Sequence, residues 1–325
     1  MTMKIFDTRS VLFVDMANTF TRHYVVNPDM TSHGLQCGGI IGTLKTIRRL
    51  VSELSPQRVI IVWEGGGSTK RRAIYADYKA NRKPERLNRF YEDDIPDTED
   101  NRVWQMATLA KLLKKFPVTQ VYVQDCEGDD VIAYLCRTHY KNHNKIILSN
   151  DRDFYQLLDE NTSVYSPQTK RIHTANDVKK EFYGITPRNF ALAKALCGDT
   201  SDNIKGVRGL GFKTLASRIP LLISDHDVTI DEILDYCRVR SSEAKVMQET
   251  VKSESVIRMN WRLVYLGGST LTHDQESKVN SILAEPTPKI DMLSFMRELN
   301  EIGVRSIDNP QQFCVSFIPL TRTQK

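Results

Sequence analysis

Four short apolar runs rich in β-branched residues, each followed by an acid, constrain the fold of this chain more than any other feature. The runs are SVLFVD, RVIIVWE, TQVYVQ and KIILSND, and the acids that end or follow them are Asp15, Glu64, Glu127 and Asp151. Such runs are typical of buried strands. Between them, GGIIGTLKTIRRLVSEL and NRVWQMATLAKLLKKF carry apolar residues at helical spacing. This alternation predicts an α/β fold with a mostly parallel central sheet and helices on both faces.

The acids after these strands are expected to meet, because ligands of such sheets bind outside the carboxyl ends of the strands. Asp129, Asp130 and Asp153 follow closely, and Asp199 and Asp202 are candidates to join from a helical region. Carboxylates that share a site either stay protonated or are neutralised by cations. Oxygen ligands without His or Cys favour Mg²⁺, with Mn²⁺ as a substitute. Two such ions about 3.5–4 Å apart are the usual arrangement for phosphodiester hydrolysis.

A single acid of this kind also has ordinary structural roles. Asp130 lies where a helix is expected to begin, and acids are favoured in the first turn of a helix. The alternative interpretation is therefore that these residues are helix caps and surface charges. Acids after four successive strands fit one shared site better than four unrelated roles.

A basic segment with interleaved tyrosines follows the second strand. Residues 68–92 contain eight Lys or Arg against three Asp or Glu, and the stretch EDDIPDTED is almost purely acidic. This pattern predicts a polyanion partner beside a separate place for cations. Lys79 or Arg82 is expected to stabilise charge on a scissile phosphate. Phosphate and base contacts are expected from Arg71, Arg72, Tyr75, Tyr78 and Lys83. The alternative is a solvated basic helix.

A glycine-rich stretch, GVRGLGFKT, contains Gly206, Gly209 and Gly211 before Lys213. Such a turn lets backbone N–H groups approach a phosphate, so we expect these four residues to bind DNA. The alternative is a plain tight turn between helices. A second glycine stretch, GGGSTK at 65–70, lacks the order G-x-x-x-x-G-K-[ST], which argues against a P-loop NTPase.

Several classes of protein are disfavoured by composition. No window approaches the roughly 18 apolar residues of a membrane span. The N-terminus lacks the features of a signal peptide, so we expect a cytoplasmic location. The six cysteines are scattered without a C-x-x-C pair, which argues against a disulfide framework or a structural zinc site.

With these residues assembled, the chain closely resembles the 5′ nuclease family. That family includes phage flap endonucleases and 5′–3′ exonucleases and the N-terminal nuclease domain of bacterial DNA polymerase I. The resemblance covers about residues 11–220, on VLFVDMANTFTR, IYADYKANRKP, EGDDVIAYL, LSNDRDFYQLL and GDTSDNIKGVRGLGFKTL, in family order. It implies a PIN-like nuclease core at 1–180 with a helical arch at 68–100. It also implies a helix–three-turn–helix DNA-binding subdomain at 181–266 and a segment at 267–325 that packs on the core.

The resemblance also implies roles for individual residues. Asp15, Glu64, Glu127 and Asp129 look like one metal site. Asp151, Asp153, Asp199 and Asp202 look like the other, with Asp129 and Asp130 near the shared edge. Lys79 matches the arch lysine at the scissile phosphate, and residues 206–213 match the element that grips duplex DNA, often with K⁺. Glu64 stands where many members have Asp, and EGDD replaces the commoner EADD.

The expected function is a structure-selective, two-metal 5′ nuclease in replication, primer removal or repair. Its substrates would be DNA with a 5′ flap, overhang or nick, and RNA–DNA hybrids. Asp15, Asp129, Lys79 and Arg82 would carry catalysis. We expect a free-standing, phage-encoded monomer that acts with replication proteins. The alternative is a catalytically inactive DNA-structure-binding protein. A haloacid-dehalogenase phosphatase is disfavoured because Asp15-Met16-Ala17 lacks its Asp-x-Asp pattern.

Overall fold

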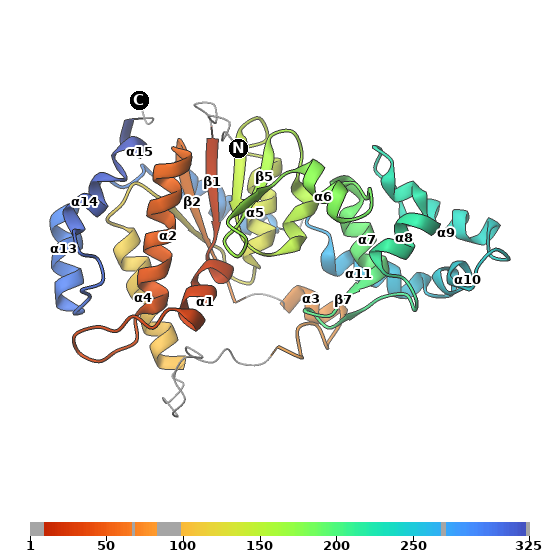
Figure 1. Ribbon diagram of the computed structural model, residues 1–325, viewed down its shortest axis with the longest axis horizontal. Coiled ribbons are helices and arrows are strands. Elements are labelled where there is room, and N and C mark those ends of the chain that lie inside the picture. Colours follow the sequence, from red (N-terminus) through yellow and green to blue (C-terminus); the bar gives the residue numbers. More distant parts are fainter. Residues whose placement is uncertain (1–9, 67–68, 83–98, 268–270, 323–325) are drawn as a thin grey trace.

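A six-stranded sheet in the order β3-β2-β1-β4-β5-β6 forms the centre of the computed structural model, which describes residues 10–66, 69–82, 99–267 and 271–322 (Figure 1). The strands are β1 (Ser10–Asp15), β2 (Arg58–Trp63), β3 (Thr119–Tyr122), β4 (Asn144–Leu148), β5 (Thr162–Ser166) and β6 (Arg171–His173). Strands β1 to β5 pair in parallel, and β6 is an antiparallel edge strand. The predicted mostly parallel sheet is confirmed.

Helices cover both faces of this sheet because successive strand side chains point to opposite sides. Leu12 and Val14 of β1 belong to one buried cluster, and Val11 and Phe13 belong to another. The first face carries α1 (Met16–Val26), α2 (Gly38–Leu54), α4 (Glu99–Leu113), α13 (Met292–Glu301), α14 (Pro310–Val315) and α15 (Ile318–Arg322). The second carries α5 (Gly128–Arg137), the 3₁₀ helix η1 (Arg152–Leu157) and α12 (His273–Ala284). The sheet is thus buried on both sides.

A helical lobe extends from one side of the sheet, on the right in Figure 1. Its elements are α6 (Ala175–Glu181), η2 (Pro187–Asn189), α7 (Phe190–Cys197), β7 (Gly198–Asp199), β8 (Ile204–Lys205), α8 (Phe212–Arg218), η3 (Pro220–Ile223), α9 (Ile230–Val239), α10 (Lys245–Lys252) and α11 (Glu254–Val264). The short helix α3 (Thr69–Ile74) packs against α11. The sequence predicts one helix from Pro187, whereas the structure has a 3₁₀ turn there and begins α7 at Phe190.

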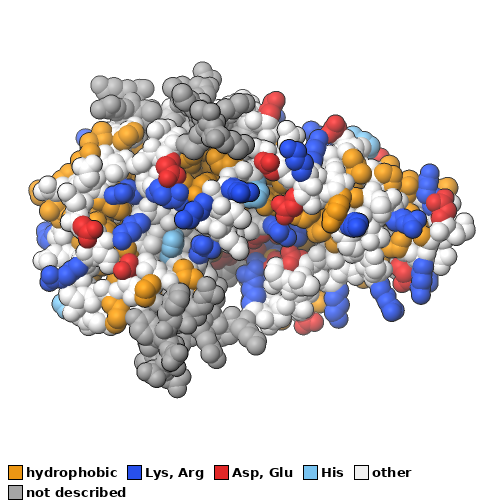
Figure 2. All heavy atoms as spheres, viewed as in Figure 1, with side chains coloured by type: hydrophobic (Ala, Val, Ile, Leu, Met, Phe, Trp, Pro, Cys, Tyr) orange, Lys and Arg blue, Asp and Glu red, His pale blue; other side chains and the backbone are white. Residues whose placement is uncertain are grey.

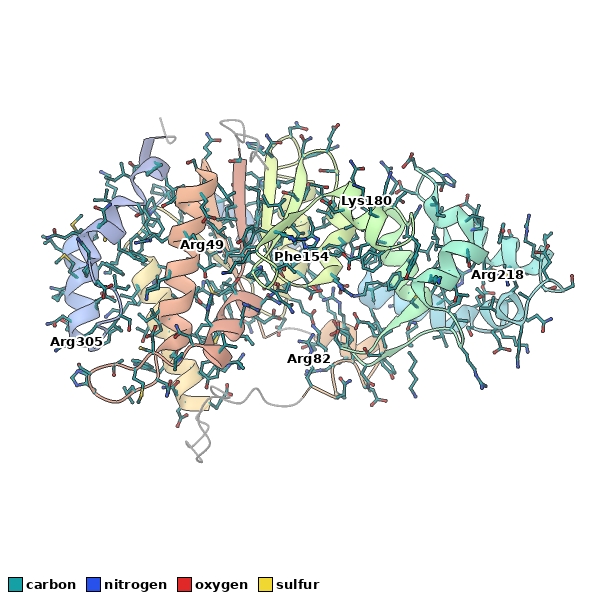
Figure 3. All side chains as sticks on the ribbon, in the orientation of Figure 1. Arg49, Arg82, Phe154, Lys180, Arg218 and Arg305 are labelled. Atoms are coloured by element: carbon teal, nitrogen blue, oxygen red, sulfur yellow. The ribbon has the colours of Figure 1, made fainter. Side chains whose placement is uncertain are left out.

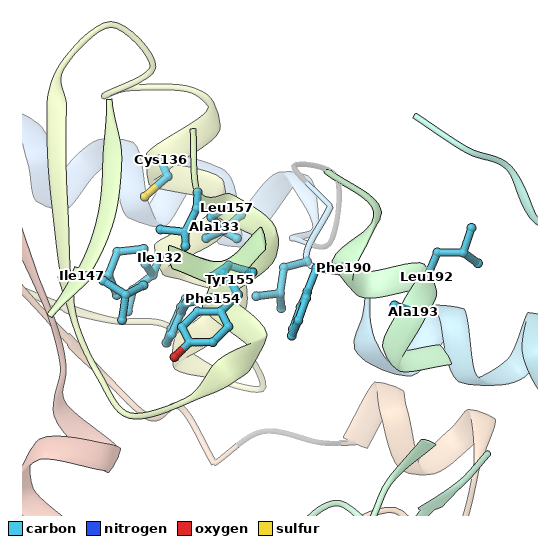
Figure 4. Close-up of a cluster of buried hydrophobic side chains, with 14 of the residues drawn as sticks. Ile132, Ala133, Cys136, Ile147, Phe154, Tyr155, Leu157, Phe190, Leu192 and Ala193 are labelled. Carbon is cyan, nitrogen blue, oxygen red and sulfur yellow. The ribbon is translucent and has the colours of Figure 1, made fainter. Parts of the chain in front are cut away.

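A buried aromatic cluster joins this lobe to the core (Figure 4). Phe154 and Tyr155 of η1 and Phe190 of α7 are all buried, and the rings of Tyr155 and Phe190 are 5.6 Å apart. Because η1 carries Asp153 and α7 leads into Asp199, this packing sets the distance between two predicted metal ligands.

After residue 270, all the regular secondary structure that the structure describes is helical, although the sequence of this segment reads as mixed. Phe295 of α13 and Phe317 pack on Phe116, with ring centroids 4.8 Å and 4.4 Å apart. These helices bury the end of α4 on the face of the sheet away from α5. No helix in the described ranges has the length and apolar character needed to cross a bilayer.

Candidate active site

Two of the predicted acids meet at the carboxyl edge of the sheet, beside β1, where the strand order reverses. Asp15 ends β1, and Asp151 follows β4, which pairs with β1. Ser149 links them, since its Oγ donates to Asp15 Oδ2 (2.7 Å) and accepts from the Asp151 backbone N–H (2.9 Å). Such reversal points are the usual ligand sites of open α/β sheets.

Helix α5 brings a second group of acids to the same edge. Glu127 immediately precedes the helix, and Asp129 and Asp130 lie in its first turn. Glu64, just after β2, accepts a hydrogen bond from the Gly128 backbone N–H at 3.3 Å. The side chain of Glu64 therefore reaches the start of α5. It is one methylene longer than the aspartate that many family members have at this position.

Three acids form the tightest group. Oxygens of Asp153, Asp199 and Asp202 lie within 4.8 Å of one another, and this is the sole group of the kind in the part of the chain that the structure describes. Asp151, predicted to share this site, is not in the trio, and neither are the four acids predicted for the other site. The structure thus gathers the predicted ligands at one edge but draws only three of them to metal-binding distance.

Burial makes the ionised form of these acids costly. Burial is the largest cause of a raised pKa in six of the predicted ligands, and repulsion between neighbouring carboxylates adds to it; these are Asp15, Glu64, Asp129, Asp130, Asp151 and Asp153. The pKa values rise to about 6 for Asp15 and Asp151 and to about 7 for Glu64, Asp130 and Asp153. The pKa of Asp129 is also raised. A set of buried carboxylates with no His or Cys among them fits hard divalent cations, which would favour the ionised forms.

Arg71 lies inside this acidic site. Its Nη1 donates to Glu127 Oε2 (2.6 Å), its Nη2 to Asp130 Oδ1 (2.9 Å) and its Nε to the Leu263 carbonyl (2.9 Å). The residue is only 7% exposed. Arg71 is therefore not placed to contact DNA, contrary to the sequence-based prediction, because its guanidinium is buried and already paired.

Tyr78 has a similar position. It is 2% exposed, and its hydroxyl donates to Asp202 Oδ2 at 3.2 Å. Its ring is therefore not placed to stack on a base, again contrary to the prediction. Tyr75 is half-buried and Arg72 is exposed, whereas Lys83 lies outside the described residues.

Lys79 and Arg82 reach across to the acids. Lys79 Nζ lies 2.8 Å from Glu127 Oε2, and Arg82 Nη2 lies 2.7 Å from Asp202 Oδ1. In Figure 3 Arg82 lies between the sheet and the helical lobe. Both residues line a cleft of about 630 Å³, together with Asp15, Glu64, Glu127, Asp129, Asp151, Arg22, Arg72 and Arg102. The cleft thus combines acidic ligands with cations that can hold phosphates.

The three glycines of the glycine-rich stretch, residues 206–213, differ in how far the fold requires them. A Cβ on Gly206 would lie 2.1 Å from the Cys197 carbonyl oxygen, so the chain itself excludes a side chain there. Gly209 has φ +83°, which favours glycine. Gly211 precedes α8 in an ordinary extended conformation, and a Cβ there would meet open space. Lys213 is exposed close by, and Figure 2 shows Lys and Arg side chains along the lower edge of the lobe.

Sequence reasoning missed Lys194. Its Nζ contacts carboxylate oxygens of Asp153 and Asp199, and the residue is 6% exposed. Burial alone would raise the pKa of Asp199, but Lys194 and Ser201 outweigh it and lower this pKa to about 2. A signal was present, since Lys194 is the lone charged residue in the apolar run FALAKALC.

The chain is similar in sequence to known proteins. A family model described as the N-terminal resolvase-like domain of 5′-3′ exonuclease matches residues 10–183. The chain is 32% identical over 192 residues to a 5′-3′ exonuclease of Aquifex aeolicus (strain VF5), which is 59% of this chain and 62% of that protein. It is 34% identical over 183 residues to a 5′-3′ exonuclease of Buchnera aphidicola subsp. Acyrthosiphon pisum (strain APS), which is 56% of this chain and 59% of that protein. The match therefore spans about three-fifths of the length of these relatives.

Solved structures establish the fold. The T5 D15 protein co-crystallised with metal ions is similar with a TM-score of 0.62 at 23% identity, over 90% of this chain and 99% of that chain. Flap endonuclease-1 from Methanococcus jannaschii is similar with a TM-score of 0.57 at 13% identity, over 97% and 94%. These likenesses show a PIN-like α/β fold. The family model matches more than half of the residues of this chain, and the chain therefore belongs to the 5′-3′ exonuclease family.

Proposed function

We propose that this chain is a divalent-metal-dependent nuclease that hydrolyses phosphodiester bonds near 5′ ends and flaps of DNA. The observation that carries the proposal is the cleft in which buried carboxylates and cationic side chains face the same space. Family membership supports it, and so does a structural neighbour, the bacteriophage T5 D15 flap endonuclease in a complex with DNA and metal ions.

The acids divide into two ion-binding sets in this proposal. Asp153, Asp199 and Asp202, with Asp151 beside them, would hold one Mg²⁺ or Mn²⁺ ion. Asp15, Glu64, Glu127 and Asp129 would hold a second, with Asp130 at the shared edge. When bound, such ions activate a water molecule and stabilise the leaving oxygen. The buried site keeps the carboxylates away from bulk water, so their charge acts strongly on the bound cation.

The cationic side chains position the phosphate. Lys79 and Arg82 bind the phosphate that reacts and stabilise the charge that develops on it. The Lys79 ammonium group pairs with Glu127, and the Arg82 guanidinium group pairs with Asp202. Both acids belong to the acidic site, where the scissile phosphate would lie in this proposal. Arg72 holds neighbouring phosphates, and Tyr75 is the remaining candidate for stacking on an unpaired base.

Duplex DNA would lie on residues 206–213, with Gly211 allowing a close approach and Lys213 adding charge. The division into a nuclease core at 1–180, a DNA-binding subdomain at 181–266 and a segment at 267–325 that packs on the core belongs to the same proposal. A helical arch at 68–100 completes it, although residues 83–98 lie outside the described part. A K⁺ ion at residues 206–213, which the resemblance implies, belongs to the same proposal.

The biological setting is a further part of the proposal. We place the activity in replication, primer removal and repair, in a cytoplasmic monomer acting with replication proteins. We also propose that the enzyme cleaves the RNA strand of an RNA–DNA hybrid. Cleavage of a 5′-labelled hybrid, measured beside cleavage of the matching DNA duplex, tests this. Cleavage of the DNA duplex alone would restrict the proposal to DNA.

The decisive experiment is incubation of labelled 5′-flap DNA with the full chain and Mg²⁺, beside an EDTA control. We expect cleavage at the junction of duplex and single strand, and none in EDTA. Asp129→Asn should abolish cleavage and retain DNA binding, because the amide keeps the side chain's size but removes the charge that holds the ion. Normal turnover by this variant in Mg²⁺ would refute the ligand assignment.

Lys79→Ala tests the phosphate role. We expect a slower single-turnover rate with a smaller change in duplex affinity, because Lys79 acts on the reacting phosphate. Lys180→Ala, an exposed lysine of α6, is the matched control. An unchanged single-turnover rate for Lys79→Ala would remove Lys79 from the mechanism.

A catalytically inactive DNA-structure-binding protein is the second candidate. The cationic cleft alone would support it. It predicts tight binding of flap DNA with no cleavage in Mg²⁺ or Mn²⁺, and the same assay therefore distinguishes the two.

A further inference from the structure

Lys194 occupies the place where the tightest group of acids would hold an ion. Its Nζ contacts Asp153 Oδ1 and lies 2.5 Å from Asp199 Oδ2. Both residues belong to the trio whose oxygens lie within 4.8 Å of one another, and Asp202 is the third. This ammonium group thus pairs with two of the three acids, and Arg82 pairs with the third, Asp202.

The main chain around Lys194 is held firmly. Phe190, one turn earlier on α7, packs on Tyr155 of η1 with ring centroids 5.6 Å apart (Figure 4). One residue later, the Ala195 carbonyl accepts a hydrogen bond from Asn260 Nδ2 of α11 at 2.9 Å. Because α7 is held from both sides, Lys194 can leave the acids only by rotation of its side chain.

There is room for that rotation. A cleft of about 1040 Å³ opens beside the trio and is lined by Lys194, Asp199, Asp151 and Asn81. Asn150 and Asp151 line both this cleft and the one that contains Lys79, so the two clefts adjoin. A long flexible lysine side chain can therefore point into open space without a change in the backbone.

A divalent ion and the ammonium group compete for the same oxygens. Two cations a few ångströms apart in a poorly solvated site repel strongly. An ion that takes Asp153 Oδ1 or Asp199 Oδ2 takes an oxygen that Lys194 now contacts.

We propose that Lys194 is an internal competitor for the divalent cation of the Asp153–Asp199–Asp202 group. It pairs with Asp153 and Asp199 while the site lacks metal, and it moves away from at least one of them when an ion binds. The competition keeps the affinity of this site for its ion low. This inference rests on the proposed function, because it takes the trio as an ion site.

Binding of Mn²⁺ to the full, metal-free chain, measured by isothermal titration calorimetry without DNA, tests the competition. Lys194→Met replaces the ammonium with a neutral side chain of similar length. We expect one Mn²⁺ site of this variant to bind about tenfold or more tightly than in the wild type, since a repelling charge has been removed. Its melting temperature in EDTA should fall, and the rise on adding Mn²⁺ should exceed that of the wild type.

Two further variants complete the test. Lys194→Arg keeps the charge and should bind Mn²⁺ no more tightly than the wild type, which also provides a result if Lys194→Met does not fold. Lys180→Met, on the exposed surface of α6 (Figure 3), should leave Mn²⁺ binding unchanged. Unchanged or weaker Mn²⁺ binding by Lys194→Met, or tighter binding by Lys194→Arg, overturns the inference and leaves the proposed function standing. Absence of Mn²⁺ binding in the wild type overturns both.

Discussion

Replacing Arg71 with methionine separates a structural role from a DNA-binding one. The guanidinium makes hydrogen bonds of 2.6 Å to Glu127, 2.9 Å to Asp130 and 2.9 Å to the Leu263 carbonyl, so it joins α3 to α5 and α11. Methionine fills a similar volume but leaves two buried carboxyl groups and one carbonyl without this partner. Removing one member of a buried ion pair typically costs about 3–5 kcal/mol, and we expect a loss of that size at pH 8.

The loss should depend on pH in a defined direction. Burial and Asp129 raise the pKa of Asp130 to about 7 even though Arg71 acts to lower it. Without Arg71 this pKa rises further above its value in the unfolded chain. A group with a raised pKa binds a proton on folding at pH values between its unfolded and folded pKa, so the stability it contributes is complete below the unfolded pKa and is lost as pH rises through the folded pKa. The Arg71→Met variant should therefore lose stability more steeply than the wild type between about pH 5 and pH 8.

The assay is urea unfolding followed by circular dichroism in EDTA, at pH 5 and pH 8. Arg72→Met, on the exposed side of the same helix, is the matched control and should change stability by less than about 0.5 kcal/mol. A loss below about 1 kcal/mol for Arg71→Met at pH 8 would fall outside the range for a buried pair and refute the reasoning. Weaker DNA binding with unchanged stability would restore Arg71 as a DNA contact.

Four other predictions concern the metal ligands and the glycines. Mn²⁺ affinity should fall as pH is lowered through about 7, with release of protons on binding, because burial raises the pKa values of Glu64 and Asp153 to about 7. Calorimetry in buffers of different ionisation enthalpy measures this, and an affinity independent of pH between 5 and 8 would contradict it. Gly128→Ala should raise the free energy of unfolding by about 0.4–1 kcal/mol, because alanine reduces the conformational entropy of the unfolded chain. The folded chain has room for the added methyl, which would make an ordinary contact of 3.6 Å with Glu64 Oε2 at the start of α5. A lower melting temperature in thermal unfolding would count against this. Gly206→Ala should destabilise the fold because its Cβ would lie 2.1 Å from the Cys197 carbonyl oxygen, whereas Gly211→Ala should keep the fold and weaken duplex binding in fluorescence anisotropy. If Gly211→Ala binds duplex DNA as tightly as the wild type does, DNA does not approach residues 206–213 closely.

The amino-acid sequence by itself determined the sheet and the edge at which acids gather. Apolar β-branched runs specify buried strands through their own composition, and strand–helix alternation leaves the parallel sheet as the natural solution. Because parallel strands end on one side, acids such as Asp15 and Asp151 must share an edge once their strands pair.

Only the tertiary structure decided which charges pair. Arg71 and Tyr78 lie in a segment whose basic and aromatic composition indicates exposure, yet both are buried against acids. Lys194 reads as one cation in an apolar helix, and its contacts with Asp153 and Asp199 arise only when α7 packs on η1. The physical reason is that strand and helix patterns depend on neighbours along the chain, whereas an ion pair depends on which distant side chains folding brings into one poorly solvated space.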